Sequence, residues 1–178
     1  IEQLNELKEL NKNLEITNQP LIAIGIGITT GIATVGEIGS IGRSDYTIIG
    51  DSVNLGSRIE SLCKFYDVSL IISEDTKEKL TKDYTFRYLD YVKVKGKENP
   101  IKLWEVLVDS NDEIKEELNI YHEAIALFTN KKIKEAFILF QELNKNYKSK
   151  KIYDIYIQRC ENFIKNNYFD NIFTHKDK

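Results

Sequence analysis

The sequence predicts an α+β protein that ends in a small all-α extension. Short, isoleucine-rich apolar runs separated by glycines indicate β-strands in the first part of the chain. After Asp109 three successive helical patterns carry little strand signal. We therefore divide the chain into residues 1–109, which mix strands and helices, and residues 110–178, which are helical.

Composition is that of a globular protein and excludes several function classes. Of the 178 residues, 42% are hydrophobic and 30% are charged, which is enough for a packed core. The formal net charge of −3 argues against nucleic-acid binding, for which a basic domain is expected. No apolar run approaches the ~20 residues that span a bilayer. We expect that this chain itself does not contact a membrane. We expect a cytoplasmic location, either for a separate protein or for the cytoplasmic part of a membrane-anchored parent.

Cysteine and histidine patterns indicate neither a disulfide framework nor a metal site. Cys63 and Cys160 stand far apart, each within a helical pattern, so we expect reduced, partly buried thiols. His122 and His175 are isolated in the helical part, and we assign them no metal or acid–base role.

An amphipathic helix opens the chain. Residues 1–16 have helical spacing of their apolar side chains, and Pro20 ends the pattern. The stripe consists of Ile1, Leu4, Leu7, Leu14 and Ile16. Such a stripe must pack against another surface.

The next segment predicts a buried strand followed by a hairpin. Leu21–Thr29 is apolar throughout, as in a strand covered on both faces. Gly25 and Gly27 share one face, where another backbone or a ligand can approach closely. Ile32–Val35 continues as the second strand of a hairpin. The loop that follows is marked by Gly36, Gly39 and Gly42.

A strand at Tyr46–Ile49 leads directly into a helix over residues 52–65. Asp51 or Ser52 is expected to cap that helix.

Asn54 and Arg58 lie four residues apart near the start of this helix and therefore share one face. An amide beside a fixed cation suits a phosphate-bearing ligand. The alternative is that Arg58 forms an ordinary surface ion pair, with Glu60 or Glu74 as partner.

Residues 69–108 predict a strand, a capped helix and a β-hairpin. Ser69–Ile72 is a short strand, and Ser73 caps the following helix. Phe86–Lys97 alternates in polarity, and Ile101–Val108 returns as its partner strand. One face of the first strand carries Val92 and Val94, and the other carries Lys93, Lys95 and Lys97.

Three helices are predicted for the extension, at Asp112–Thr129, Lys132–Tyr147 and Lys151–Asn166. A tetratricopeptide-like hairpin is suggested by the spacing of Ala124, Leu127, Ala136 and Phe140. One such hairpin cannot bury its own apolar face. It must dock on residues 1–109 or on a partner.

Four stretches together resemble the C-terminal part of a class III nucleotidyl (adenylate/guanylate) cyclase catalytic domain. They are GIGITTG (25–31), VGEIGS (35–40), RSDYTIIGDSVNLGSRIESL (43–62) and VKVKGKENPIKLWEV (92–106). They occur in the family's order and at its spacings, over about half of the chain. More weakly, residues 121–173 resemble a helical tail that follows the cyclase domain in some bacterial membrane-anchored members.

The resemblance implies a ferredoxin-like fold with an antiparallel sheet and helices on one side. It also implies cyclisation of ATP to cyclic AMP and pyrophosphate, by attack of the ribose 3′-hydroxyl on the α-phosphate. By the match, Asn54 orients the ribose and Arg58 stabilises the transition state. Lys95 meets the terminal phosphates, and Thr47 stands at the purine-specifying position. Thr47 favours adenine but leaves guanylate cyclase as an alternative.

The chain departs from the family in lacking the two aspartates that bind Mg²⁺ or Mn²⁺. Both precede the helix that begins this chain, so we expect residues 1–178 to be the C-terminal portion of a longer enzyme, inactive or nearly so alone. The missing strands would leave the strand at 21–29 with an open edge. The family implies a homodimer with shared active sites. A non-catalytic dimerisation or nucleotide-sensing module remains an alternative, as does protein binding by the helical extension.

Overall fold

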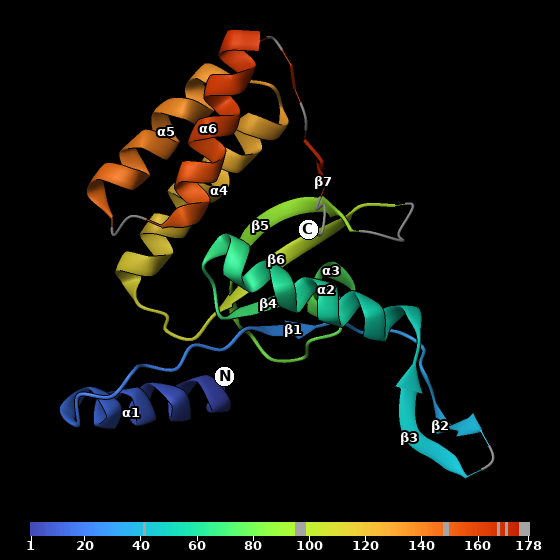
Figure 1. The fold of residues 1–178 in the computed structure, drawn as a ribbon. Coiled ribbons are helices and arrows are strands. Elements are labelled where there is room, and N and C mark those ends of the chain that lie inside the picture. The colour runs from blue at the N-terminus through green and yellow to red at the C-terminus, as the bar shows by residue number, and fades with distance from the viewer. Residues whose placement is uncertain (41, 95–98, 148–149, 167, 170, 175–178) are drawn as a thin grey trace.

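A computed structural model describes residues 1–40, 42–94, 99–147, 150–166, 168–169 and 171–174. Within these residues the fold is a mixed sheet with helices on both faces, a separate two-stranded hairpin and a group of three C-terminal helices (Figure 1). The elements are α1 (Glu2–Ile16), β1 (Ile26–Ile28), β2 (Thr34–Ser40), β3 (Arg43–Ile49), α2 (Asp51–Tyr66), β4 (Leu70–Ser73), α3 (Glu74–Glu78), β5 (Thr85–Lys93), β6 (Ile101–Leu107), α4 (Asp112–Thr129), α5 (Ile133–Asn146), α6 (Lys151–Asn166) and β7 (Phe173–Thr174).

The sheet has the strand order β1-β4-β6-β5-β7. The predicted hairpin of β5 and β6 is confirmed, and β4 pairs antiparallel with β6. The two outer pairs, β1 with β4 and β5 with β7, are parallel, so the sheet is mixed, whereas the resemblance implied an antiparallel one. Within the described residues β1 pairs on one side only, and its other edge is open, as expected from the sequence.

Alternation along β4 divides the core into two layers. Ile71 faces α2 and the C-terminal helices, whereas Leu70 and Ile72 face Leu4 of α1. Because α1 lies on the face opposite α2, helices cover both sides of the sheet, which corrects the one-sided arrangement expected. The predicted apolar stripe of residues 1–16 is only partly buried, since Ile1 and Ile16 are exposed.

The segment predicted as a long buried strand at Leu21–Thr29 is strand only at Ile26–Ile28. Leu21, Ile22 and Ile24 are exposed, so burial on both faces is also wrong. The physical reason is pairing: among the described residues β1 has β4 as its one strand neighbour, and only three residues take part.

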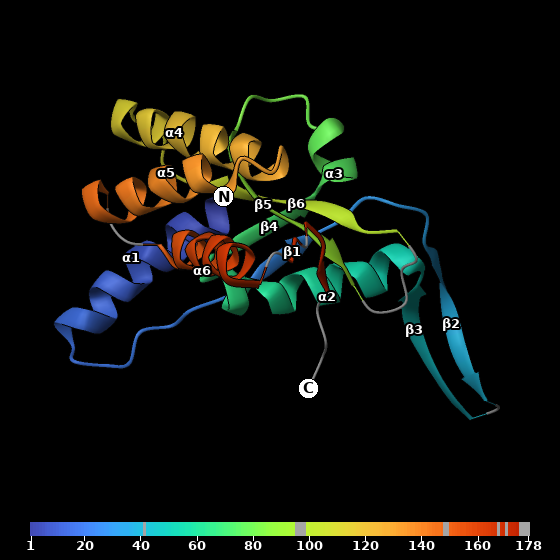
Figure 2. The ribbon, with the colours of Figure 1, turned by 90° about the horizontal axis from the view of Figure 1, so that it is seen from above.

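The stretch that glycines marked as a loop is instead a regular hairpin. Strand β2 runs through Gly36 and Gly39 and pairs with β3 from Thr34–Ile49 to Ser40–Arg43. We call residues 34–40 and 42–49 the arm, because they project away from the five-stranded sheet (Figures 1 and 2). Glycine is tolerated there because the backbone hydrogen bonds of the arm are formed within its own two-stranded ladder.

Helix α2 lies directly on the glycines of β1. A Cβ added to Gly27 would lie 2.6 Å from the carbonyl oxygen of Gly56 and 2.5 Å from the backbone nitrogen of Glu60. The sequence left open whether a backbone or a ligand approaches this strand face, and the helix backbone does so. The absence of a side chain at residue 27 thus sets how deeply α2 sits on the sheet.

We expect Gly27→Ala to lower the free energy of unfolding by about 1–3 kcal/mol, because rigid backbone atoms of α2 must move. Urea denaturation monitored by circular dichroism measures this. Gly36→Ala is the matched control, since a Cβ there meets no atom within 4 Å. Equal stability losses in the two variants would contradict this view of the β1–α2 contact.

The three C-terminal helices, α4–α6, form what we call the helical tail. Their bounds agree with the predicted helices to within one residue at each end. One continuous apolar cluster joins α2 and the sheet to the tail, and it includes Leu62, Leu103, Tyr121 and Tyr156. Docking on residues 1–109, one of the two alternatives left open, is therefore what occurs.

Candidate functional site

The first turn of α2 is held against the segment that follows β1. The hydroxyl of Thr29 donates to the carbonyl oxygen of Ser52 at 2.7 Å, and the hydroxyl of Ser52 donates to the carbonyl oxygen of Ile32 at 3.0 Å. The N-cap residue is Gly50, without a side-chain cap. The predicted capping role of Asp51 or Ser52 is therefore wrong, because the Ser52 hydroxyl bonds a neighbouring segment instead.

Asn54 and Arg58 occupy the first two turns of α2, as the sequence predicted. Asn54 is exposed and Arg58 is half-buried. The opposite side of the helix buries Leu55, Ile59 and Leu62 against the sheet. The apolar contacts thus orient the helix, and the amide and the guanidinium share the face that remains.

Arg58 forms no ion pair within the described part of the chain. Glu74, one of the two alternative partners, instead accepts a hydrogen bond from the Trp104 indole and lies 3.8 Å from the Lys102 ammonium. The ordinary surface ion pair, with Glu60 or Glu74, is therefore not formed. A half-buried guanidinium without an ion-pair partner among the described residues can bind an anion.

Thr47 lies on β3, opposite Gly36 in the arm, and is exposed. Its strand ends at Ile49, two residues before α2 begins, so the arm and the site helix are directly connected. Lys95 lies outside the described residues. The alternation that pointed to it is confirmed up to Val94, because Val92 and Val94 are buried and Lys93 is exposed.

The acidic residues near α2 do not fit the two-metal site that the family implies. Among the described residues no group of three or more histidine, cysteine, aspartate or glutamate side chains is placed to hold a metal ion. Hard divalent cations need several oxygen ligands converging on one point.

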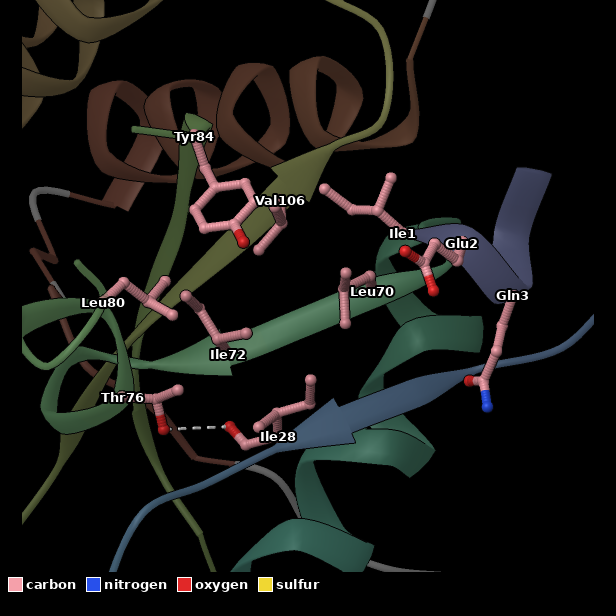
Figure 3. A pocket seen from close by; sticks show the side chains of 10 residues that line it. All are labelled: Ile1, Glu2, Gln3, Ile28, Leu70, Ile72, Thr76, Leu80, Tyr84 and Val106. Carbon is pink, nitrogen blue, oxygen red and sulfur yellow. Dashed lines mark hydrogen bonds between the residues drawn. The ribbon is translucent and has the colours of Figure 1, made fainter. Parts of the chain in front are cut away.

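A pocket of about 450 Å³ lies on the other face of the sheet, between α1 and strands β1, β4 and β6 (Figure 3). Its floor is apolar, with Ile28, Leu70, Ile72 and Val106 from three adjacent strands. Glu2 and Gln3 of α1 stand at its edge. Neither Asn54, nor Arg58, nor Thr47 contributes to it, so it is separate from the candidate site.

Buried polar networks link the helical tail to the sheet, and the sequence did not reveal them. Arg87 of β5, 2% exposed, pairs with Glu105 at 2.5 Å and with Glu117 at 2.8 Å. Glu117 also accepts hydrogen bonds from Lys150, at 2.5 Å, and from the Tyr153 hydroxyl. Strand periodicity places Arg87 on a face but cannot show that partners from distant parts of the chain converge on it.

The pKa values of these groups follow from burial and partners. Burial raises the pKa of Glu105 above its ordinary value, with the nearby Arg87 charge opposing the change. For Glu117 burial acts in the same direction, but hydrogen bonds from Lys150 and Tyr153 and the charge of Arg87 outweigh it and lower the pKa. The network therefore holds Glu117 as a carboxylate.

His122 packs inside this region as a neutral acceptor. Its Nε2 accepts the backbone N–H of Tyr88 at 3.3 Å. Burial, with the charges of Arg87 and Lys77, lowers its pKa below the ordinary 6.5.

We expect the stability that His122 contributes to be complete above about pH 6.5 and to decrease as the pH falls toward the lowered folded-state pKa, because the unfolded chain binds the proton more readily. Urea midpoints between about pH 7.5 and about pH 5.5 measure this, and His122→Gln should show a shallower dependence. Identical pH dependence in the two proteins would contradict it.

Comparisons with known proteins identify the fold. Residues 3–107 match the family described as the adenylate and guanylate cyclase catalytic domain. The chain is 42% identical over 93 residues to an adenylate cyclase of Anabaena cylindrica, covering 51% of this chain and 18% of that protein. It is 34% identical over 152 residues to the terminal-differentiation specific adenylate cyclase of Dictyostelium discoideum, covering 81% of this chain and 7% of that protein.

Among solved structures, the adenylyl cyclase CyaB from P. aeruginosa superposes with a TM-score of 0.51 at 33% identity, covering 61% of this chain and 54% of that one. This chain thus spans 18% or less of the length of the two relatives above. None of the helices among the described residues combines the length and hydrophobicity needed to cross a bilayer. The family match covers more than half of the chain and includes the helix that carries Asn54 and Arg58. The chain therefore belongs to the class III adenylate and guanylate cyclase catalytic domain family.

Proposed function

We propose that this chain is the C-terminal portion of an adenylate cyclase that converts ATP to cyclic AMP and pyrophosphate. The observation that carries the proposal is α2, which presents Asn54 and Arg58 on one solvent-accessible face inside the segment that matches the family. Two relatives of the chain are named adenylate cyclases.

In this proposal Asn54 and Arg58 have separate roles. The Asn54 amide donates to and accepts from the ribose and holds the 3′-hydroxyl in line with the α-phosphorus, which reduces the entropic part of the barrier. The Arg58 guanidinium donates to the phosphate oxygens as negative charge accumulates in the transition state. The planar fork of donors that arginine provides suits this role better than a lysine ammonium does.

Thr47 and Lys95 are proposed to complete the part of the substrate site that this chain supplies. The exposed hydroxyl of Thr47 is available to the purine edge from β3. Lys95 follows β5 by two residues and is proposed to meet the terminal phosphates, where a mobile point charge is sufficient. Thr47 also admits a guanine base, so GTP is the alternative substrate.

The metal-binding half of the site is proposed to lie outside residues 1–178. The described residues do not provide a metal cluster, and β1 has an edge to which further strands can add. When bound, Mg²⁺ or Mn²⁺ would neutralise phosphate charge and assist departure of pyrophosphate. We accordingly propose that residues 1–178 alone are inactive or nearly so.

The arm supports the proposed homodimer with shared active sites. Five large apolar side chains of the arm, and one just before it, are between 46% and 94% exposed. Leaving so much apolar surface in contact with water is unfavourable, and a contiguous patch of this kind is typical of a protein–protein interface. They are Ile32, Val35, Ile38, Tyr46, Ile48 and Ile49. Because the arm also carries Thr47, a second copy that covers it would bring its own groups close to this half-site.

For the tail we retain the proposal of a tetratricopeptide-like hairpin over α4 and α5, in a unit comprising residues 110–178. Ala124 and Ala136, at the positions that predicted the hairpin, are fully buried. A continuous match over 81% of the chain must include α4, so the tail's first helix also has a counterpart in the Dictyostelium enzyme.

The test is a cyclase assay on the complete protein that contains this chain and on residues 1–178 alone. We expect cyclic AMP from ATP, with Mg²⁺ or Mn²⁺, from the complete protein, and essentially none from the isolated chain. Cyclic AMP formation by the isolated chain that is lost in Arg58→Ala would overturn the half-site proposal. Product from GTP alone would favour the guanylate cyclase alternative, and no product from either nucleotide would favour a non-catalytic module.

A further inference from the structure

Strand β5 contains a bulge at its centre, where side chains of the helical tail contact it. The pairing of β5 with β6 changes register between Tyr88 and Asp90. A bulge leaves backbone groups without ladder partners, and buried ones must find them elsewhere. The Tyr121 hydroxyl of α4 donates to the Tyr88 carbonyl at 2.8 Å, and the Tyr156 hydroxyl of α6 donates to the Leu89 carbonyl at 2.9 Å. The tail therefore completes the hydrogen bonding of the sheet.

Asp90, which follows the bulge, joins three elements through one buried carboxylate. It is 1% exposed. The guanidinium of Arg159 on α6 binds it in bidentate fashion, with Nη1–Oδ1 at 2.9 Å and Nη2–Oδ2 at 2.5 Å. The hydroxyl of Tyr66, the last residue of α2, donates to Oδ2 at 2.8 Å. The backbone N–H of Tyr91 donates to Oδ1 at 2.9 Å.

This arrangement is sensitive to loss of its cation. A buried carboxylate is tolerated only when it is paired and hydrogen-bonded, and removing one partner leaves an uncompensated charge. Burial, reinforced by the Asp90 charge, raises the pKa of Tyr66 well above its ordinary value, so the Tyr66 hydroxyl remains a donor. Only the guanidinium of Arg159 balances the Asp90 charge by an ion pair within the described residues.

Tyr66 and the candidate site belong to the same continuous helix. Asn54 and Arg58 lie in the first two turns of α2, and Tyr66 ends it. A helix is stiff over this length, so a rotation or shift at one end moves the side chains at the other. The other end of α2 rests on the glycines of β1, which set its depth, and the Thr29 and Ser52 hydroxyls hold its first turn against the segment after β1. The bond to Asp90 is the polar contact that holds the last turn, so the two ends together fix the rotation of the helix.

We propose that Arg159 is a positioning residue that acts through Asp90 and Tyr66 to set the rotation of α2, and thereby the placement of Asn54 and Arg58. The inference rests on the proposed cyclase function of that helix. Arg159 does not touch the reacting atoms. The helical tail is then a working part of the catalytic unit, because α6 contributes one of the contacts that fix how α2 lies on the sheet.

A second ion network offers a matched control. Lys150, just before α6, pairs with Glu117 of α4 at 2.5 Å, and Glu117 in turn pairs with Arg87 of β5, so this network also ties the tail to the sheet. No member of that network belongs to α2. Lys150→Gln and Arg159→Gln each remove one cation from the tail that binds a buried carboxylate. Only Arg159→Gln removes the connection to Tyr66.

The experiment compares these variants in two readouts at a temperature where all are folded. In residues 1–178, Arg159→Gln should increase amide exchange in the first two turns of α2 by about tenfold, and Lys150→Gln should leave it unchanged. In the complete cyclase, Arg159→Gln should lower kcat by about tenfold while KM for ATP stays within about twofold. Arg159→Lys should recover part of kcat, since it keeps the charge but loses the fork.

A double-mutant cycle tests the route. Adding Tyr66→Phe to Arg159→Gln should lower kcat no further, because both variants break the same connection. Equal exchange and equal kcat in the Arg159→Gln and Lys150→Gln proteins would overturn the positioning role. If the complete wild-type protein makes no cyclic nucleotide, the proposed function fails, and the exchange measurement alone then decides whether Arg159 positions α2.

Discussion

Replacing Arg58 with alanine in the complete cyclase is expected to lower kcat for cyclic AMP formation by about 10²–10³-fold, with a smaller change in KM for ATP. The reason is that, in the proposed mechanism, the guanidinium faces charge that develops only as the α-phosphorus becomes five-coordinate. The structure leaves this side chain half-buried and without an ion pair among the described residues, so its donors are available to a ligand.

Steady-state kinetics with ATP and Mg²⁺ or Mn²⁺ measures the effect. Lys64→Ala is the matched control, because Lys64 is an exposed cation near the other end of the same helix. Arg58→Lys should recover little activity, since a single ammonium cannot reproduce the planar donor fork. An Arg58→Ala enzyme with kcat near that of Lys64→Ala would refute the transition-state role of Arg58.

Replacing Arg87 with methionine is expected to lower the free energy of unfolding of residues 1–178 by about 3–5 kcal/mol. The substitution leaves Glu105 and Glu117 buried together without the cation that lies 2.5 Å and 2.8 Å from them. Because the pKa of Glu105 is already raised by burial, removing Arg87 should raise it further and favour the protonated form.

Urea denaturation near neutral pH measures the loss, which should shrink as the pH is lowered and the carboxylates take up protons. Lys8→Met is the matched control, because its partner Asp109 is 3.5 Å away and both side chains are more than half exposed. That exposed pair should contribute no more than about 1 kcal/mol. Similar losses in the two variants would show that the buried network is not a stabilising link between sheet and tail.

Local pattern was sufficient for most elements. The alternation of Val92 and Val94 with the lysines predicted β5, and helical spacing predicted α2 and the three tail helices, because periods of about two and 3.6 residues report directly on which face is buried. The N-cap role of Ser73 was also predictable, since its side chain needs only the N–H of Thr76 three residues later.

Predictions failed where pairing partners decide. Gly36 and Gly39 looked like loop residues, yet they lie in β2 because β3 supplies their backbone partners. The apolar Leu21–Thr29 run is long enough for a strand, but only the three residues that reach β4 form one. Ser52 was predicted as a possible helix cap, but its hydroxyl donates a hydrogen bond to the nearby Ile32 carbonyl instead.

For the candidate site, the sequence by itself determined the residue types and their common face: Asn54 and Arg58 are four residues apart on a helix whose apolar side must face the core. Only the tertiary structure decided what positions that helix. Gly27 admits its backbone, and Asp90 connects its last residue, Tyr66, to Arg159, which lies 69 residues after Asp90 in the chain. The physical reason is that burial of a charge depends on partners brought together by folding, whereas periodicity records only the burial of nearby apolar side chains.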